Sequence, residues 1–147
     1  MYRRQGGPLQ VFLVHPGGPF WAKKDQGAWS IPKGEYAEAE PPLEAARREF
    51  QEETGFAAPP DNYLELGTLK HAGGKIVSAW AFEGDCDPQK LTSNLCQLEW
   101  PPRSGRQISF PEVDRGGWFD LIEARVRILK SQEPFLEVLC RELKLRA

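Results

Sequence analysis

Three acidic residues, Glu49, Glu52 and Glu53, stand close together in a strongly charged stretch of the chain. If that stretch is a helix, their spacings of three and four residues place the carboxylates on one face near its C-terminal end. Like charges repel at these spacings, and negative charge there also opposes the helix dipole. A bound cation would reverse both effects, so the cluster predicts a metal site. A solvated charged helix face is the alternative.

The ligands in this cluster are all carboxylates, which suit hard cations. Mg²⁺ and Mn²⁺ take oxygen ligands and keep several waters. The chain has only two histidines and three cysteines, and the cysteines are widely separated, so a soft-metal site is not expected. Hard cations beside carboxylates commonly neutralise phosphate oxygens and activate a water. We therefore expect hydrolysis of a phosphoanhydride, with Mg²⁺ as cofactor and Mn²⁺ as a possible substitute.

A helix of about a dozen residues must position these carboxylates. Pro41 and Pro42 suit its first turn, and Gly55 suits the position just beyond its end. The apolar residues Leu43, Ala46 and Phe50 recur at three- and four-residue intervals. One stripe of the helix can therefore face a core, while the remainder is charged.

Strands are predicted on both sides of this helix, because short apolar and β-branched runs are bounded there by glycine and proline. The segment 15–28 reads as a surface loop, and two amphipathic helices around Pro134 follow Asp120. This mixture predicts an α+β or α/β sandwich with helices packed on a sheet. The predicted strands are residues 9–14, 29–31, 63–71, 75–82, 96–100, 107–110 and 117–119, with a glycine turn at 72–74 joining the two in the middle.

Size and composition predict one globular domain, residues 1–147. The chain has 147 residues, of which 40% are hydrophobic and 27% charged, and its net charge is −2. Without a global basic field, neither a nucleic acid polymer nor an anionic membrane is an expected partner. The three cysteines suit free thiols, and no signal-type apolar run follows the first residues, so we expect a cytoplasmic protein.

Residues 34–56 fit the pattern GX5EX7REUXEEXGU, where U is a bulky apolar residue, at all nine specified positions. This pattern is the 23-residue box of the Nudix hydrolases, and the chain resembles that family. The resemblance implies the Nudix fold, a mixed β-sheet between helices in an α/β/α sandwich. It also implies metal-dependent cleavage of a phosphoanhydride bond in a nucleoside diphosphate linked to another moiety.

The same resemblance implies roles for individual residues. Arg48 would orient Glu49, and Glu40 would support the ligands without touching the metal. Either Glu49 or Glu53 would be the general base. The implied metal ligands are Gly34 through its carbonyl, Glu49, Glu52 and Glu53.

Outside the box, two segments resemble the branch that hydrolyses diadenosine polyphosphates and diphosphoinositol polyphosphates. Residues 29–34 look like its lead-in to the box, which implies that Lys33 touches a phosphate. Residues 70–75 look like a hairpin that directs a lysine, here Lys75, toward the phosphate chain. For both lysines the alternative is a solvated side chain.

Residues after this hairpin give further candidates. Glu99 is expected as an additional ligand or base, as a glutamate outside the box is in several Nudix subfamilies. Arg103, with Arg106 in the same loop, is a candidate for binding substrate phosphates, and a solvated loop is the alternative. Glu112 precedes the last predicted strand and is expected to be structural.

The favoured substrate is a diadenosine polyphosphate such as diadenosine tetraphosphate. Two other enzymatic activities stay open, a housecleaning nucleoside triphosphate pyrophosphohydrolase and a diphosphoinositol polyphosphate hydrolase. A Nudix module that senses a nucleotide without cleaving it is the non-enzymatic alternative. A monomer or a homodimer is expected. Because Nudix folds begin with a longer first strand than residues 1–4 allow, we also expect about five to ten additional native residues at the N-terminus.

Overall fold

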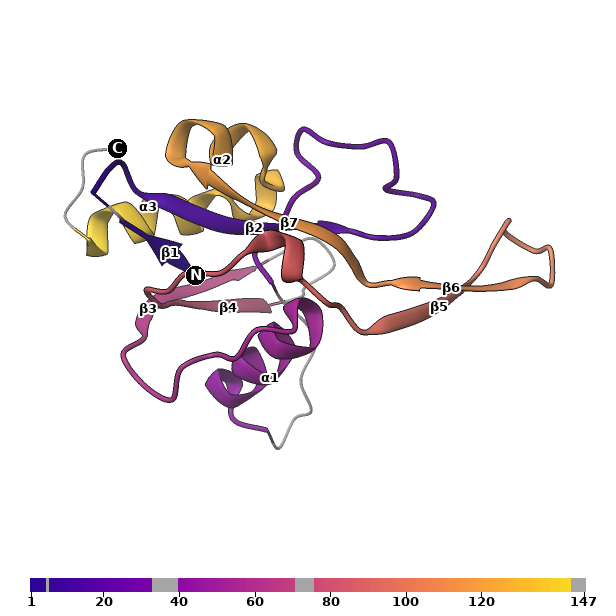
Figure 1. Cartoon of the computed structure of the whole chain (residues 1–147), viewed down its shortest axis with the longest axis horizontal. Helices are drawn as coiled ribbons and strands as arrows, with labels where there is room; N and C mark the ends of the chain where they lie inside the picture. The colour runs from indigo at the N-terminus through magenta and orange to yellow at the C-terminus, as the bar shows by residue number, and fades with distance from the viewer. Residues whose placement is uncertain (5, 33–39, 71–75, 144–147) are drawn as a thin grey trace.

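The computed structural model describes residues 1–4, 6–32, 40–70 and 76–143 (Figure 1). The helices are α1 (Pro42–Thr54), α2 (Leu121–Arg127) and α3 (Glu133–Glu142), with short 3₁₀ turns η2 (Pro88–Lys90) and η3 (Lys130–Gln132). The strands are β1 (Tyr2–Arg3), β2 (Gln10–Pro16), β3 (Leu64–Lys70), β4 (Ile76–Ala81), β5 (Leu95–Glu99), β6 (Gln107–Pro111) and β7 (Val113–Asp120).

The strands pair in three antiparallel groups, ordered β1-β2-β7, β3-β4 and β5-β6. A parallel bridge between Tyr2 and Glu83 joins the first group to the chain just after β4. There the Tyr2 amide donates to the Phe82 carbonyl at 3.0 Å, and the Gly84 amide donates to the Tyr2 carbonyl at 2.9 Å. The strand layer is therefore mixed in direction, as the sequence predicted.

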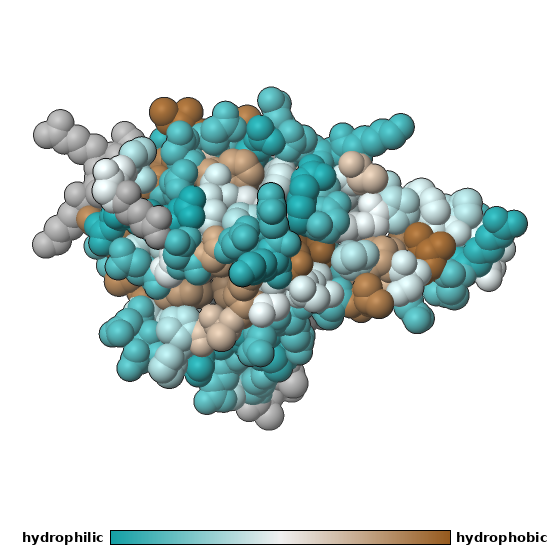
Figure 2. Space-filling view, in the orientation of Figure 1, coloured by the Kyte–Doolittle hydropathy of each residue, from teal (hydrophilic) through white to brown (hydrophobic). Residues whose placement is uncertain are grey.

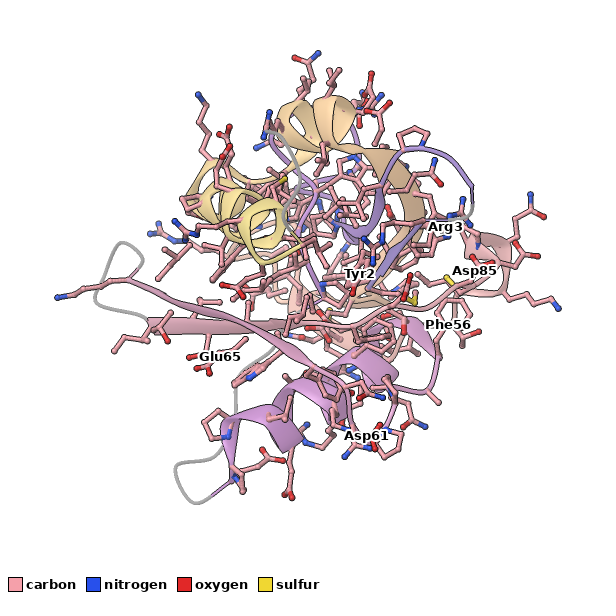
Figure 3. All side chains as sticks on the ribbon, turned by 90° about the vertical axis from the view of Figure 1, so that its left-hand side faces the viewer. Tyr2, Arg3, Phe56, Asp61, Glu65 and Asp85 are labelled. Atoms are coloured by element: carbon pink, nitrogen blue, oxygen red, sulfur yellow. The ribbon has the colours of Figure 1, made fainter. Side chains whose placement is uncertain are left out.

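Helices cover both sides of this strand layer. Figure 1 shows α1 on one side of the layer, with α2 and α3 on the other, and Figure 3 shows the same order from the side. In Figure 3, Tyr2 and Arg3 lie at the junction of the strand groups, where the Arg3 guanidinium pairs with Asp85 at 2.7 Å. The predicted α/β/α sandwich is confirmed.

The core forms around β2, whose five central residues are all buried. A strand with apolar residues on both faces needs cover on both faces, and β2 receives it. Leu13 packs in one cluster with residues of β3, β4, α2 and α3, and Phe12 packs in a second with Val113 and Trp118. His15 is the last of these buried residues, so it belongs to β2 and is not part of the predicted surface loop.

The box helix ends as the sequence predicted. Gly55 has φ 77° and its amide donates to the Gln51 carbonyl at 2.8 Å, which closes the last turn. A Cβ at this position would lie 2.9 Å from the Thr92 carbonyl oxygen. Glycine is needed here both for its backbone conformation and for this close approach.

Most of the other predicted elements are confirmed with changed limits. The two middle strands are β3 and β4, and their glycine turn falls outside the described residues. The last strand, β7, begins at Val113, four residues before the predicted start, because it pairs along the whole of β2. The predicted strand at 29–31 forms only isolated bridges, from Trp29 and Ser30. Across the described residues, the helices are too short or too polar to cross a membrane.

The close approach at Gly55 predicts a measurable loss of stability. We expect Gly55→Ala to lower the free energy of unfolding by about 2–4 kcal/mol, because backbone strain and a clash with Thr92 add together. Gly105→Ala is the matched control, since Gly105 has φ 76° but a Cβ added there would meet nothing within 4 Å. Its cost should be about 1 kcal/mol, from strain alone. Urea unfolding of both variants measures the difference, and equal costs would contradict a role for the Thr92 contact.

Candidate functional site

The helix α1 divides into a buried side and a charged side. Ala45 and Phe50 are 2% and 5% exposed and face the core, where the Phe50 ring meets the Phe82 ring edge-on at 5.2 Å. Burying this stripe fixes the rotation of the helix. Near the C-terminal end of the helix, Glu53 is buried together with these apolar residues, whereas the side chains of Glu49 and Glu52 are 12% and 41% exposed.

One guanidinium organises this charged side. Arg48 donates to both oxygens of Glu40, from Nε at 3.0 Å and from Nη2 at 2.9 Å. Its Nη1 donates to Glu49 at 3.0 Å and to Glu52 at 3.1 Å. The planar fork of arginine suits this task, since it makes the bidentate pair and still has an N–H group for two further carboxylates. The predicted orientation of Glu49 by Arg48 is present in this geometry.

Of the three carboxylates that contact Arg48, Glu49 is the most buried. Its side chain is 12% exposed, against 24% for Glu40 and 41% for Glu52. The pKa of Glu49 is raised above its ordinary value of 4.5, first by burial and then by the charge of Glu52. Arg48 works in the opposite direction and lowers this pKa.

Glu53 lies deeper than its neighbours and is 5% exposed. The next residue, Thr54, is fully buried and donates from Oγ1 to the Phe50 carbonyl at 2.6 Å. Thr54 Oγ1 also accepts from the Phe56 amide at 3.1 Å, which fixes the exit of the chain from the helix. The box carboxylates are thus at different depths, with Glu53 beneath and Glu49 and Glu52 closer to the surface.

Residues 92–94, which we call the strap, tie the end of α1 to another part of the chain. The Thr92 amide donates to the Thr54 carbonyl at 2.9 Å, and the Asn94 amide donates to the Glu52 carbonyl at 2.8 Å. These bonds satisfy carbonyls that a helix end leaves without an internal donor. On its other side the strap accepts from the Glu112 amide, through the Asn94 carbonyl, at 2.9 Å.

The strap brings Glu112 to the box carboxylates. Glu112 lies between β6 and β7, and its charge raises the pKa of Glu49, although less than burial and Glu52 do. It lines the same cavity as Glu49 and Glu52. Glu112 was expected to be structural, and its surroundings make it a candidate site residue. The sequence offered only its position before the last strand, because the contact depends on the strap.

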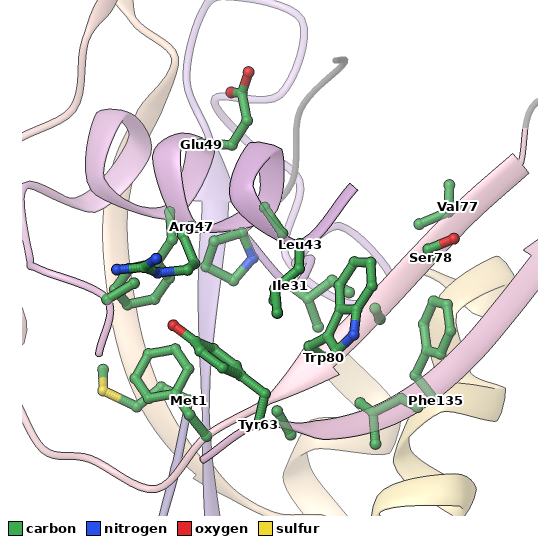
Figure 4. A pocket seen from close by; sticks show the side chains of 18 of the residues that line it. Met1, Ile31, Leu43, Arg47, Glu49, Tyr63, Val77, Ser78, Trp80 and Phe135 are labelled. Atoms are coloured by element: carbon green, nitrogen blue, oxygen red, sulfur yellow. The ribbon is translucent and has the colours of Figure 1, made fainter. Parts of the chain in front are cut away.

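A cavity of about 850 Å³ opens beside these carboxylates (Figure 4). Its walls come from α1, β2, β3, β4 and α3, and most of the lining is apolar. Figure 4 shows Trp80 and Tyr63 inside the cavity, with Arg47 beside Tyr63, whereas Glu49 projects from the other side of α1, away from these three side chains. The volume lies in the range of roughly 300–1,000 Å³ that is usual for small-molecule sites.

The carboxylate oxygens of the site suit a hard divalent cation. Within the described part of the chain, the side chains as they lie do not surround a common point where such a cation would bind. Glu49, Glu52 and Glu53 supply only carboxylate oxygens, as Mg²⁺ and Mn²⁺ prefer. Glu49 and Glu52 are turned toward Arg48, and among the described residues no three acidic, histidine or cysteine side chains converge on one point. Binding a metal through these residues would require at least one carboxylate to turn away from Arg48.

The remaining predicted residues divide into two groups. Lys33, Gly34 and Lys75 lie outside the described residues. Glu99 and Arg103 are exposed and lie on the β5–β6 hairpin, which Figure 1 shows projecting away from the helices. The structure therefore brings Glu40, Arg48, Glu49 and Glu52 together around one guanidinium and does not bring Glu99 or Arg103 to them within the chain.

Comparison with known proteins identifies the family to which this fold and site correspond. A family model described as the NUDIX domain matches residues 1–139. A curated relative, an uncharacterized 17.7 kDa protein from the e-segB intergenic region of Enterobacteria phage T4, is 31% identical over 88 residues. That match covers 58% of this chain and 57% of the relative.

Solved structures show the same fold at low sequence identity. An Ap4A hydrolase from C. elegans, solved as a binary complex, has a TM-score of 0.64 and 19% identity, over 97% of this chain and 93% of its own. The NUDIX domain of NrtR from Shewanella oneidensis, solved with ADP ribose, has a TM-score of 0.65 and 16% identity, over 97% of this chain and 82% of its own.

The carboxylate cluster makes a prediction about the pKa of Glu49 in metal-free protein. We expect Glu52→Gln to lower it, because the substitution removes a negative charge that raises it and releases a donor of Arg48. Glu44→Gln is the control, since Glu44 is exposed at the start of the same helix. Carbon-detected NMR titration of the Glu49 carboxyl measures both. An unchanged or higher pKa in Glu52→Gln would show that the two carboxylates are not coupled.

Proposed function

Since the chain belongs to the family of Nudix hydrolases, we propose that it is a metal-dependent enzyme that cleaves a phosphoanhydride bond in a nucleoside diphosphate linked to another moiety. The observation that carries this proposal is the grouping of Glu40, Glu49 and Glu52 around Arg48, with Glu49 and Glu52 among the residues that line a cavity of about 850 Å³. Nudix hydrolases generally use divalent metals, and the donor set here suits one.

We assign a role in catalysis to each carboxylate from how deeply it is buried. Glu49 and Glu52 line the cavity, whereas Glu53 lies beneath them. We assign Glu49 as the base that takes a proton from the attacking water, because Glu49 is one of the residues that line the cavity and Arg48 holds its carboxylate in place. Glu53 is the alternative base. Glu40 keeps Arg48 in position through its bidentate pair.

Mg²⁺ or Mn²⁺ would be held by Glu49, Glu52 and Glu53, with the Gly34 carbonyl as a further ligand. The ion would supply positive charge against the phosphate oxygens of the substrate. Glu112 lines the same cavity, and its amide donates to the Asn94 carbonyl of the strap at 2.9 Å. We propose that Glu112 completes the acidic site, as a ligand or by accepting a hydrogen bond from the water.

For the substrate, we propose a diadenosine polyphosphate such as diadenosine tetraphosphate. Support comes from the segments 29–34 and 70–75, which resemble the dinucleotide polyphosphate branch, and from the fold shared with the C. elegans Ap4A hydrolase. ADP ribose, present in the NrtR complex, also satisfies the chemistry of a nucleoside diphosphate linked to another moiety. Lys33 and Lys75 would contact the phosphate chain.

We also propose a cytoplasmic location. Cys86, Cys96 and Cys140 are free cysteines, which is typical of a reducing compartment. A nucleotide substrate is in keeping with that location.

A panel of nucleotides with product identification tests the activity. With Mg²⁺ or Mn²⁺ we expect hydrolysis of diadenosine tetraphosphate to ATP and AMP, and no turnover with a chelator. Release of pyrophosphate from nucleoside triphosphates would favour a pyrophosphohydrolase, and cleavage of ADP ribose would favour a sugar-linked substrate. Equal slow turnover with and without metal for every compound would overturn the proposal in favour of a nucleotide-sensing module.

Substitutions separate the roles of the carboxylates. We expect Glu49→Gln to lower kcat by about 10²- to 10⁴-fold, as loss of a general base does. Glu112→Gln should lower it by about 10- to 100-fold, in keeping with a supporting position. Glu44→Gln should stay within about a factor of two, because Glu44 is exposed and, unlike Glu40, Glu49 and Glu52, has no hydrogen bond to Arg48. If Glu53→Gln is far more damaging than Glu49→Gln, the base is Glu53.

A further inference from the structure

The hairpin formed by β5 and β6, residues 95–111, projects from the rest of the chain, with Phe110 and Pro111 at its base close to Gly17 and Gly18; we call it the arm. Figure 1 shows it projecting to one side of the sandwich. Each of its residues is exposed or half-exposed, so the arm has no core of its own. Its strands pair with each other and have no extensive contacts with another described element. Two-stranded hairpins without cover are marginally stable in water.

The arm nevertheless has an apolar face. Cys96 pairs with Phe110 and Leu98 pairs with Ile108, which places these four side chains on the same side. Leu98 is 39% exposed, and Leu95 on the opposite face is 66% exposed. Figure 2 shows apolar side chains along the arm between polar ones.

The two strand edges of the arm are also unprotected. Among the residues of β5 and β6 the only charged one is Glu99, at the end of β5. Solvated edge strands are usually guarded by charged side chains, lysine above all. An edge without them is suited to pairing with another strand.

The arm has an acidic root and a basic tip. At its root, the strap residue Asn94 bonds to Glu52 of α1, and Glu112 follows β6 directly. At its tip, Arg103 and Arg106 are both exposed. The tip is ordered by backbone bonds, from the Trp100 amide to the Arg106 carbonyl at 2.9 Å and from the Ser104 amide to the Pro101 carbonyl at 3.1 Å.

We propose that the arm pairs with the arm of a second copy of this chain, antiparallel about a two-fold axis, and that each tip brings Arg103 and Arg106 to the carboxylate site of the other copy. Antiparallel pairing of a strand with its own copy is two-fold symmetric, so one edge serves both partners. The apolar faces of the two arms then form one continuous surface. The role of the arginines rests on the proposed function, whereas the pairing does not.

The length and the charges of the arm favour this arrangement. Strands of five residues span roughly 17 Å, and an antiparallel copy of the same length places each tip over the root of its partner. There the basic tip meets the acidic root, with Glu52 and Glu112, so the charges are complementary. Within one chain the tip lies at the end of the arm remote from α1 (Figure 1). Guanidinium groups delivered in this way would bind phosphate oxygens of the substrate.

Sedimentation of the full chain tests the pairing. We expect the wild type to sediment at twice the chain mass and Leu98→Glu to sediment as a monomer, because the new charge lies in the shared apolar face. Ile122→Glu is the matched control, since Ile122 is 78% exposed on α2, and it should remain a dimer. Thermal melting confirms that both variants are folded. A monomeric wild type, or a dimer that Leu98→Glu leaves intact, would overturn the pairing.

Mixing two defective variants tests the contribution across the interface. Arg103→Ala combined with Arg106→Ala should lower kcat/KM at least about tenfold, whereas Arg141→Ala, an exposed arginine of α3, should not. Co-refolding the double variant with Glu49→Gln forms mixed dimers in which one site has both intact carboxylates and an intact arm from its partner. About a quarter of wild-type activity should return, since half of the dimers are mixed and each has one complete site.

The outcomes keep this inference apart from the proposed function. A dimeric protein that hydrolyses no nucleotide would leave the pairing standing and remove the function. An active protein whose mixed dimers recover nothing would leave the function standing and show that the arginines do not act across the interface.

Discussion

The structure of the candidate site depends on a single charge balance, in which one guanidinium holds three carboxylates. Glu40, Glu49 and Glu52 would repel one another at these distances, and Arg48 offsets that repulsion by donating to all three. The balance is incomplete, because burial and the charge of Glu52 still raise the pKa of Glu49. A site that keeps excess negative charge near a cavity favours the binding of a cation.

Keeping this cluster in place requires the end of α1 to be fixed, and that task falls to residues distant in the sequence. Gly55 ends the helix in a conformation that favours glycine and leaves room for the Thr92 carbonyl. The strap then bonds to the last helical carbonyls and, through Asn94, to Glu112. The same segment thus stabilises the helix end and completes the acidic surroundings of Glu49.

The arm extends from this strap, which connects the site to the most exposed part of the fold. Its root belongs to the acidic site, while its tip has two exposed arginines, Arg103 and Arg106. A second copy would bring the two ends together and cover the uncharged strand edges. The exposed strand edges destabilise the arm in isolation, and the same edges are available to pair with a second copy.

The local pattern of the chain was enough to predict the box helix with its limits and most of the strands and helices. Those features follow from spacing, from proline and glycine at element ends, and from apolar runs, all of which act between near neighbours. The family resemblance also implied that Arg48 orients Glu49. The depth of Glu53, the arrival of Glu112 beside Glu49 and the distance of Arg103 from its own site were not predictable, because they depend on contacts between segments such as 92–94 and α1. Such contacts form only when packing brings remote parts of the chain together, and no spacing along the sequence encodes them.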